Sequence, residues 1–112
     1  MSVAIAISEG VAQHLSTLVL GDTDNIDQKL VLLLEAEYRR RLARYSLIDR
    51  QMSQKYAMSF EAFEQQRVTE QQNYSWDVES DAMAWETALD GIQTIQRKLV
   101  EIENILLENE LI

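Results

Sequence analysis

Apolar residues recur every three or four positions over most of this chain, which is the pattern of amphipathic helices. The longest such series is Val31, Leu34, Tyr38, Leu42, Tyr45, Ile48, Met52 and Tyr56. It predicts a helix over about residues 26–57, roughly 48 Å long, with Asn25 and Gln28 spaced as a capping box at its start. Such a helix is longer than a compact domain of this size, so we expect either a break near Ser46 or an extended, oligomeric shape.

A second long helix is predicted from about Ser75 or Asp77 to near the end of the sequence. Its apolar positions repeat every seven residues, at Val78, Trp85, Ile92, Leu99 and Leu106, with Ile95 and Ile102 at the second heptad position. This spacing is typical of a coiled-coil seam. Gly91 weakens the helix by roughly 1 kcal/mol relative to alanine, so it marks either a kink or a close helix crossing.

Shorter elements are predicted on either side of the first long helix. Residues 3–7 alternate β-branched residues with alanine, which predicts a short strand. Ser8 is suited to cap a following helix that Gly21 would end. Ser59 is suited to begin a third helix, ending near residues 71–73, with Met58 and Phe63 placed as a hydrophobic staple. We therefore expect a mainly α protein with a short N-terminal β-strand and about four helices, two of them long.

Charge is sorted along the chain. Residues 25–57 carry seven Lys/Arg and four Asp/Glu, whereas residues 58–112 carry three and twelve, and the whole chain has a net charge of −9. This balance disfavours a chain that wraps nucleic acid, and favours a basic protein partner or simple solubility. We expect an acidic helical partner-binding segment over residues 46–112. Because a single strand needs a partner, we expect a dimerisation segment over residues 1–45, in one compact or extended unit with the acidic segment.

Residue types that carry catalysis or hold metals are sparse. The 112 residues include no cysteine, one histidine, and three glycines that do not cluster. The densest acidic set is Glu79, Asp81, Glu86 and Asp90, and it lacks the Glu-x-x-His pair of di-metal bundles, so solvated helix surface is its better interpretation. We expect no catalytic, cofactor-binding or metal-binding residue. We also expect no membrane span, and a cytoplasmic location.

Four arginines between residues 39 and 44 form the basic peak of the chain. Arg39 and Arg41 each have a glutamate one helical turn upstream, which is the favoured order for an ion pair. Arg40 and Arg44 have no acid four residues upstream. They are expected to pair with the acidic last helix of the same chain or of a second copy. A nucleic-acid phosphate contact is the alternative.

Aromatic residues concentrate at the start of the last predicted helix. Trp85 falls on the apolar stripe and is expected in the core, whereas Trp76 precedes the helix and is free to act as an exposed anchor. Aromatic side chains surrounded by acidic residues are typical of a surface that binds a basic protein. The residues predicted for such a surface are Tyr74, Trp76, Asp77, Glu79, Asp81 and Glu86.

The first 45 residues resemble ribbon-helix-helix proteins. The resemblance rests on one alternating strand, a helix opened by Ser8, a turn at residues 21–25 and a second helix from Ile26. It implies a dimer in which strands of two chains pair into a ribbon, and in that family the ribbon enters the DNA major groove.

About half the chain, from Tyr38 to Ile92, resembles small prokaryotic antitoxin-like proteins found in cyanobacteria and archaea. The resemblance rests on Tyr-Arg-Arg-Arg-Leu at 38–42, Lys-Tyr-Ala-Met-Ser-Phe-Glu-Ala-Phe-Glu at 55–64 and Tyr-Ser-Trp-Asp-Val-Glu at 74–79. It implies a cytoplasmic protein that neutralises a small toxin by direct binding. We expect a non-enzymatic homodimer, because the single strand needs a partner and the helices are long, and the acidic C-terminal half favours a basic partner. The alternatives are a ribbon-helix-helix DNA-binding regulator, which would use Arg40 and Arg44, and a self-assembling helical scaffold.

Overall fold

The structure, a computed structural model, describes residues 2–20 and 23–110, and these residues form helices and connecting segments without any strand. The helices are α1 (Glu9–Thr17), α2 (Ile26–Tyr56), α3 (Phe60–Gln65), α4 (Val68–Gln71) and α5 (Trp76–Glu110). They include 79% of the described residues, which confirms a mainly α protein.

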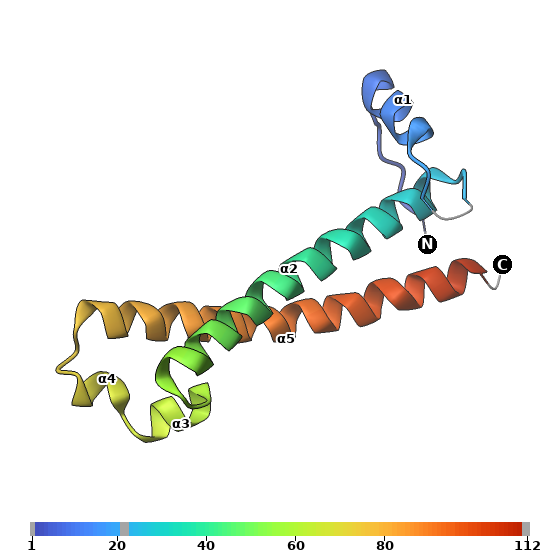
Figure 1. Cartoon of the computed structure of the whole chain (residues 1–112). Coiled ribbons are helices and arrows are strands. Elements are labelled where there is room, and N and C mark those ends of the chain that lie inside the picture. Colours follow the sequence, from blue (N-terminus) through green and yellow to red (C-terminus); the bar gives the residue numbers. More distant parts are fainter. Residues whose placement is uncertain (1, 21–22, 111–112) are drawn as a thin grey trace.

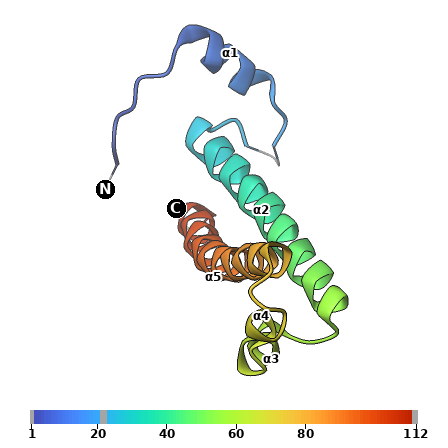
Figure 2. The ribbon, with the colours of Figure 1, turned by 90° about the vertical axis from the view of Figure 1, so that its left-hand side faces the viewer.

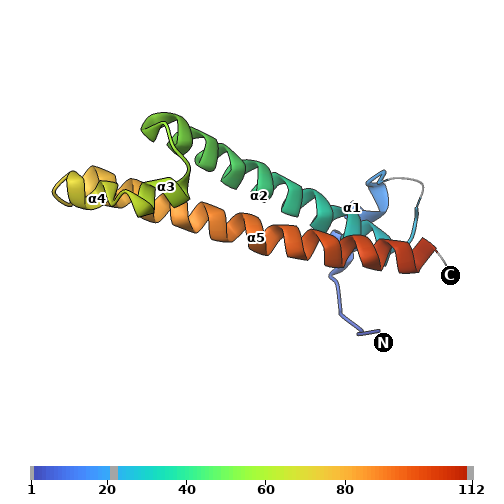
Figure 3. The ribbon, with the colours of Figure 1, turned by 90° about the horizontal axis from the view of Figure 1, so that it is seen from below.

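Two long helices dominate the molecule. The helices α2 and α5 run antiparallel and side by side as a hairpin, with α3 and α4 at its closed end (Figures 1 and 3). The helix α2 passes through Ser46 without a break, so of the two expected alternatives the extended shape is the one observed. The molecule measures 57 × 31 × 23 Å with a radius of gyration of 20.0 Å. A compact chain of this length has a radius of gyration of about 13 Å.

The core lies along the seam between α2 and α5 in two clusters. The open-end cluster comprises Val31, Ile95, Leu99 and Ile102, with Tyr38, Leu42, Tyr45 and Leu106 packed against it. The closed-end cluster comprises Phe63, Val68 and Trp85, with further apolar side chains of α2, α3 and α5 around it. The predicted heptad positions of α5 are all buried or half-buried, as a coiled-coil seam requires.

Leu34 was wrongly placed on the α2 core stripe. Its side chain is 44% exposed, whereas Val31 is buried against α5. Three residues turn a helix by about 300°, so Leu34 lies about 60° around α2 from Val31, on a flank that α5 does not cover.

Gly91 marks a close crossing of the two long helices. A Cβ atom added there would lie 2.7, 2.8 and 2.9 Å from three ring atoms of Tyr45 on α2. Real non-bonded carbon contacts are near 3.5–4.0 Å, so the absence of a side chain is what lets the Tyr45 ring lie on α5.

Local capping follows the sequence closely. The side chains of Ser8, Asn25 and Ser59 each accept a hydrogen bond from the backbone N–H three residues ahead, at 3.3, 3.2 and 3.2 Å. Only half of the expected capping box forms, because the Gln28 side chain bonds to Thr23.

The expected strand over residues 3–7 does not form. These residues are irregular and exposed, with Val3 at 83% and Ile5 at 78%. A strand needs a hydrogen-bonding neighbour, and the described part of this chain offers none. Gly21, the expected end of the first helix, lies outside the described residues, and α1 already ends at Thr17.

The helix α1 stands apart from the hairpin, near the first turn of α2 (Figures 1 and 2). Of its apolar residues only Leu15 is buried, while Val11 is 52% exposed. Lys29 of α2, itself 3% exposed, donates a hydrogen bond of 2.9 Å from Nζ to the Leu15 carbonyl. This bond satisfies a carbonyl in the last turn of α1, where cations are favoured. No helix in the described residues is both long and apolar enough to cross a membrane.

Candidate functional site

The closed end of the hairpin contains every described non-glycine residue with positive φ. Ala57 (φ 55°) ends α2, Arg67 (φ 51°) separates α3 from α4, and Asn73 and Tyr74 (φ 54° and 53°) precede α5. L-residues pay roughly 1–2 kcal/mol each for this conformation. The single helix expected from Ser59 to about residue 71 is therefore wrong, because the chain reverses its twist at Arg67 and forms two short helices instead.

An aromatic cluster holds this strained connection against the hairpin. Phe63 and Trp85 are 2% and 0% exposed, and their ring centroids lie 5.4 Å apart in an edge-to-face arrangement. Tyr56 and Phe60 complete the cluster at centroid distances of 6.1 and 5.2 Å from Trp85. The indole N–H of Trp85 donates to Asp49 Oδ1 at 2.8 Å, so the buried ring also has its polar atom satisfied.

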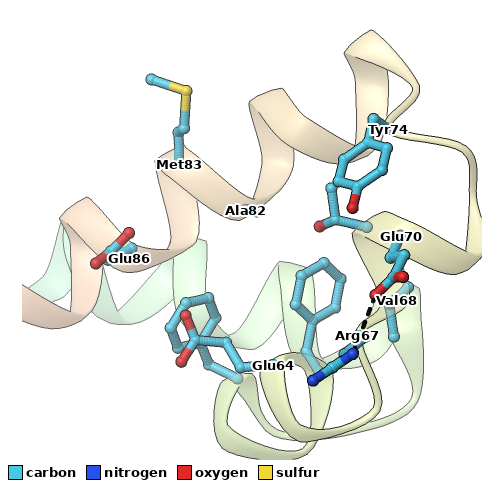
Figure 4. A pocket seen from close by; sticks show the side chains of 11 residues that line it. Glu64, Arg67, Val68, Glu70, Tyr74, Ala82, Met83 and Glu86 are labelled. Carbon is cyan, nitrogen blue, oxygen red and sulfur yellow. Dashed lines mark ion pairs between the residues drawn. The ribbon is translucent and has the colours of Figure 1, made fainter.

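A groove of about 500 Å³ opens between the α3–α4 segment and the first turns of α5. Its apolar lining consists of Phe60, Phe63, Val68, Tyr74, Ala82 and Met83. Tyr74 and Met83 are 60% and 68% exposed; in Figure 4 Tyr74 lies at the α4 side of the groove, whereas the Met83 side chain points away from α3 and α4 on the outer side of α5. The groove therefore has a buried apolar floor and one accessible apolar wall, at Tyr74.

Charged residues of the groove are mostly acidic. Glu64, Glu70 and Glu86 line it together with one cation, Arg67. Arg67 pairs with Glu70 at 3.6 Å, and both side chains are more than half exposed (Figure 4). Glu64 of α3 and Glu86 of α5 have no ion pair among the described residues, so the groove has an uncompensated negative rim.

The structure brings only part of the predicted surface together. Tyr74 and Glu86 line the groove, whereas Trp76 (79% exposed), Asp77 and Glu79 lie outside its lining.

Asp81 differs from the rest of the predicted surface because it faces α2. Lys55 Nζ and the Tyr56 hydroxyl donate to Asp81 Oδ2 at 2.5 and 2.6 Å. The hydrogen bonds from Lys55 and Tyr56 lower the pKa of Asp81 below its ordinary value of 3.8. Burial, followed by the hydrogen bond to Asp81, raises the pKa of Tyr56 to about 12. Asp81 therefore ties the two long helices together at the closed end.

Sequence patterns did not reveal the other half of the groove. Glu64, Arg67 and Val68 approach α5 only because the chain turns at Arg67, and no residue type there signals a left-handed conformation. The Met58–Phe63 staple is the nearest usable signal, because both side chains do pack in the closed-end cluster.

The arginine run is largely neutralised within the chain. Arg39 Nη2 lies 2.9 Å from Glu103 Oε1 of α5, and Arg40 and Arg41 both bind Glu37, at 2.6 and 3.0 Å. The hydrogen bonds from Arg40 and Arg41 lower the pKa of Glu37 to about 2.

Within the described residues Arg40 does not make the pair with the last helix that was expected of it, because it binds Glu37 three residues upstream on its own helix; a cross-helix pair is made by Arg39 instead. Within residues 2–20 and 23–110, Arg44 has no carboxylate within 4.0 Å.

Residues typical of catalysis or metal binding do not converge at the groove. In the described parts of the chain, no three His, Asp or Glu side chains are placed to share a metal ion. Compared with protein-family models, with curated proteins and with solved structures, the chain finds a match in none of the three.

Proposed function

We propose that this protein is a non-enzymatic protein-binding module, and that its groove takes a basic segment of a partner protein. The observation that carries the proposal is the combination of an apolar floor, made by Phe63 and Val68, with the unpaired carboxylates of Glu64 and Glu86 at the rim. An apolar side chain of the partner would fill the groove, and flanking lysines or arginines would meet the carboxylates.

Charge complementarity supports a basic partner. The groove belongs to the acidic half of the chain, where residues 58–112 carry twelve acids and three bases. Opposite charge at an interface raises the association rate and rejects acidic competitors, while a buried apolar or aromatic contact supplies most of the affinity. Trp76, which is 79% exposed and lies nearly two turns before the groove residues of α5, would extend the contact area.

The resemblance to antitoxin-like proteins suggests what the biological role of this binding is. In this proposal the partner is a small basic toxin in the same cytoplasm, and covering its basic face neutralises it. Binding alone is sufficient for this role, so no catalytic residue or cofactor is needed.

The test is co-expression with the product of the adjacent gene, followed by titration calorimetry of the purified pair. The double variant Glu64→Lys/Glu86→Lys should weaken binding by more than about tenfold, because it places two cations against a basic segment. Asp90→Lys/Glu101→Lys is the matched control, since it changes net charge equally at exposed α5 positions outside the groove. Equal losses in both variants, or no binding by the wild type, would refute the proposal.

A DNA-binding regulator is the second candidate, and Arg44 is the observation in its favour, because it is exposed and has no ion pair in the described structure. Arg40 is already bound to Glu37 through two hydrogen bonds of 2.8 and 2.6 Å, which leaves less charge for phosphate. Specific binding to upstream DNA with a steep salt dependence, lost in Arg44→Ala, would favour this function over the first.

A further inference from the structure

Among the described residues, Arg67 is the one cation that lines the groove, and it lies between two of the groove's acids. Glu64 precedes it by about one helical turn and Glu70 follows it on α4, and Figure 4 shows the Arg67 side chain between them. Its Nη1 atom lies 3.6 Å from Glu70 Oε2. Arg67 therefore already occupies a position beside a carboxylate that a lysine or arginine of a basic partner would take.

The ion pair between Arg67 and Glu70 is weak. Its 3.6 Å separation is longer than a hydrogen bond, and the two side chains are 78% and 53% exposed. Exposed ion pairs of this kind contribute little free energy, because water solvates both charges and two side chains lose freedom. Glu37 on α2 is bound more closely, by two arginines at 2.6 and 3.0 Å. Arg67 can therefore leave Glu70 at a small cost in energy.

The helix α4 does not depend on this ion pair. The backbone N–H of Gln71 donates to the Arg67 carbonyl at 3.0 Å, and that of Tyr74 donates to the Thr69 carbonyl at 2.9 Å. Arg67 stands at the N-cap of α4, but its side chain makes no capping hydrogen bond, because a guanidinium group has no acceptor. Moving the guanidinium away from Glu70 thus leaves the backbone hydrogen bonds of α4 in place.

The backbone of Arg67 indicates that its side chain has a use beyond local folding. With φ 51° and ψ 47° it is left-handed, a conformation that glycine adopts without strain. An arginine there adds strain and caps nothing. Strained residues of this kind cluster at binding sites, where the position of the side chain matters.

We propose that Arg67 is a displaceable internal cation, which neutralises Glu70 in the free protein and is replaced there by a lysine or arginine of the bound segment. This inference rests on the proposed function of the groove and adds a selectivity to it. A basic segment recovers the interaction with Glu70 that Arg67 gives up, whereas a neutral segment cannot. Arg67 also repels incoming cations, so it keeps the affinity for basic segments below what the three glutamates alone would give.

An NMR titration of the ¹⁵N-labelled full chain tests the exchange, with the peptide Lys-Lys-Leu-Trp-Lys-Lys as the probe, at low salt where exposed charges are least screened. Backbone amide shifts at the groove locate the peptide and give its Kd. Arg67→Gln removes the charge and keeps a long polar side chain. It should bind the peptide about two- to fivefold more tightly than the wild type, the factor that corresponds to an exposed ion pair. Arg67→Gln/Glu70→Gln should lose this gain, because the freed carboxylate is its source.

The matched control is Arg97→Gln, because Arg97 is exposed on α5 outside the groove lining and the substitution changes the net charge equally. Its Kd should stay close to that of the wild type. The neutral peptide Gln-Gln-Leu-Trp-Gln-Gln should bind Arg67→Gln and the wild type equally. An unchanged Kd in Arg67→Gln, equal gains in Arg97→Gln or with the neutral peptide, or a gain that survives in the double variant would overturn the exchange and leave the groove's proposed function standing. Absence of binding at the groove in every form would overturn both.

Discussion

The crossing of α2 and α5 depends on the missing side chain of Gly91, so Gly91→Ala is an informative substitution. The new methyl group would lie within 2.9 Å of three atoms of the Tyr45 ring, which belongs to the side chains packed on the open-end cluster. Either the ring moves out of the seam or the two helices separate. The same substitution also replaces the poorest non-proline helix former with the best.

These two effects have opposite signs and comparable sizes. The helix preference of alanine over glycine stabilises by about 1 kcal/mol, and overpacking a seam costs about 1–3 kcal/mol. In the wild type, Gly91→Ala should therefore range from neutral to a loss of about 2 kcal/mol. In a Tyr45→Ala background, where the ring is gone, the same substitution should stabilise by about 1 kcal/mol.

The measurement is a double-mutant cycle from urea unfolding followed by circular dichroism, at one fixed protein concentration because association shifts apparent stability. The expected coupling between Gly91 and Tyr45 is about 1–3 kcal/mol. Gly10→Ala is the control, since no atom lies within 4 Å of the added Cβ, and it should cause no loss. A coupling below about 0.5 kcal/mol would refute the close crossing.

Three further outcomes are expected at the closed end. Asp81 has a pKa below its ordinary value of 3.8, so its contribution to stability is present above that pH and is lost as the pH falls below it. In Asp81→Asn the free energy of unfolding should therefore fall less steeply with decreasing pH in this range. Tyr56 has a pKa raised from 10.0 to about 12, so its contribution to stability is complete below pH 10 and is lost between pH 10 and 12. The absorbance of ionised tyrosine should show this late titration in the wild type and not in Tyr56→Phe. Asp49→Ala should cost about 1–3 kcal/mol in urea unfolding because it leaves the Trp85 indole N–H unsatisfied, whereas Asp49→Asn, which keeps an acceptor, should recover most of that loss.

Features set by neighbouring residues in the sequence were the predictable ones. Caps at Ser8 and Ser59 depend on hydrogen bonds across three residues, and the α5 heptad depends only on helical periodicity. Gly91 could be identified from the sequence because glycine weakens a helix interior. Of the two alternatives, a kink or a close helix crossing, the structure shows the close crossing.

Features that depend on distant segments were not predictable from pattern. The groove needs α3 and α4 to fold back on α5, which follows from left-handed backbone at Arg67 and Tyr74, two residues with no special preference for it. The bond from Lys29 to the Leu15 carbonyl joins residues 14 apart across a turn. The expected strand failed for a related reason, because alternation describes which faces a strand would present and supplies no neighbouring strand.

The antiparallel hairpin also has a kinetic consequence. Its cross-helix contacts grow steadily more distant in sequence: Tyr56 meets Asp81 across 25 residues, Asp49 meets Trp85 across 36, and Arg39 meets Glu103 across 64. Closing the longest of these loops costs about 0.8 kcal/mol more than closing the shortest.

We therefore expect folding to begin at the closed end and to proceed along the seam toward the open end. A substitution at Asp49 would then slow folding, whereas one at Ile102 would mainly speed unfolding. The connection beside the groove, whose backbone is the most strained in the molecule, is therefore expected to form before the rest of the seam.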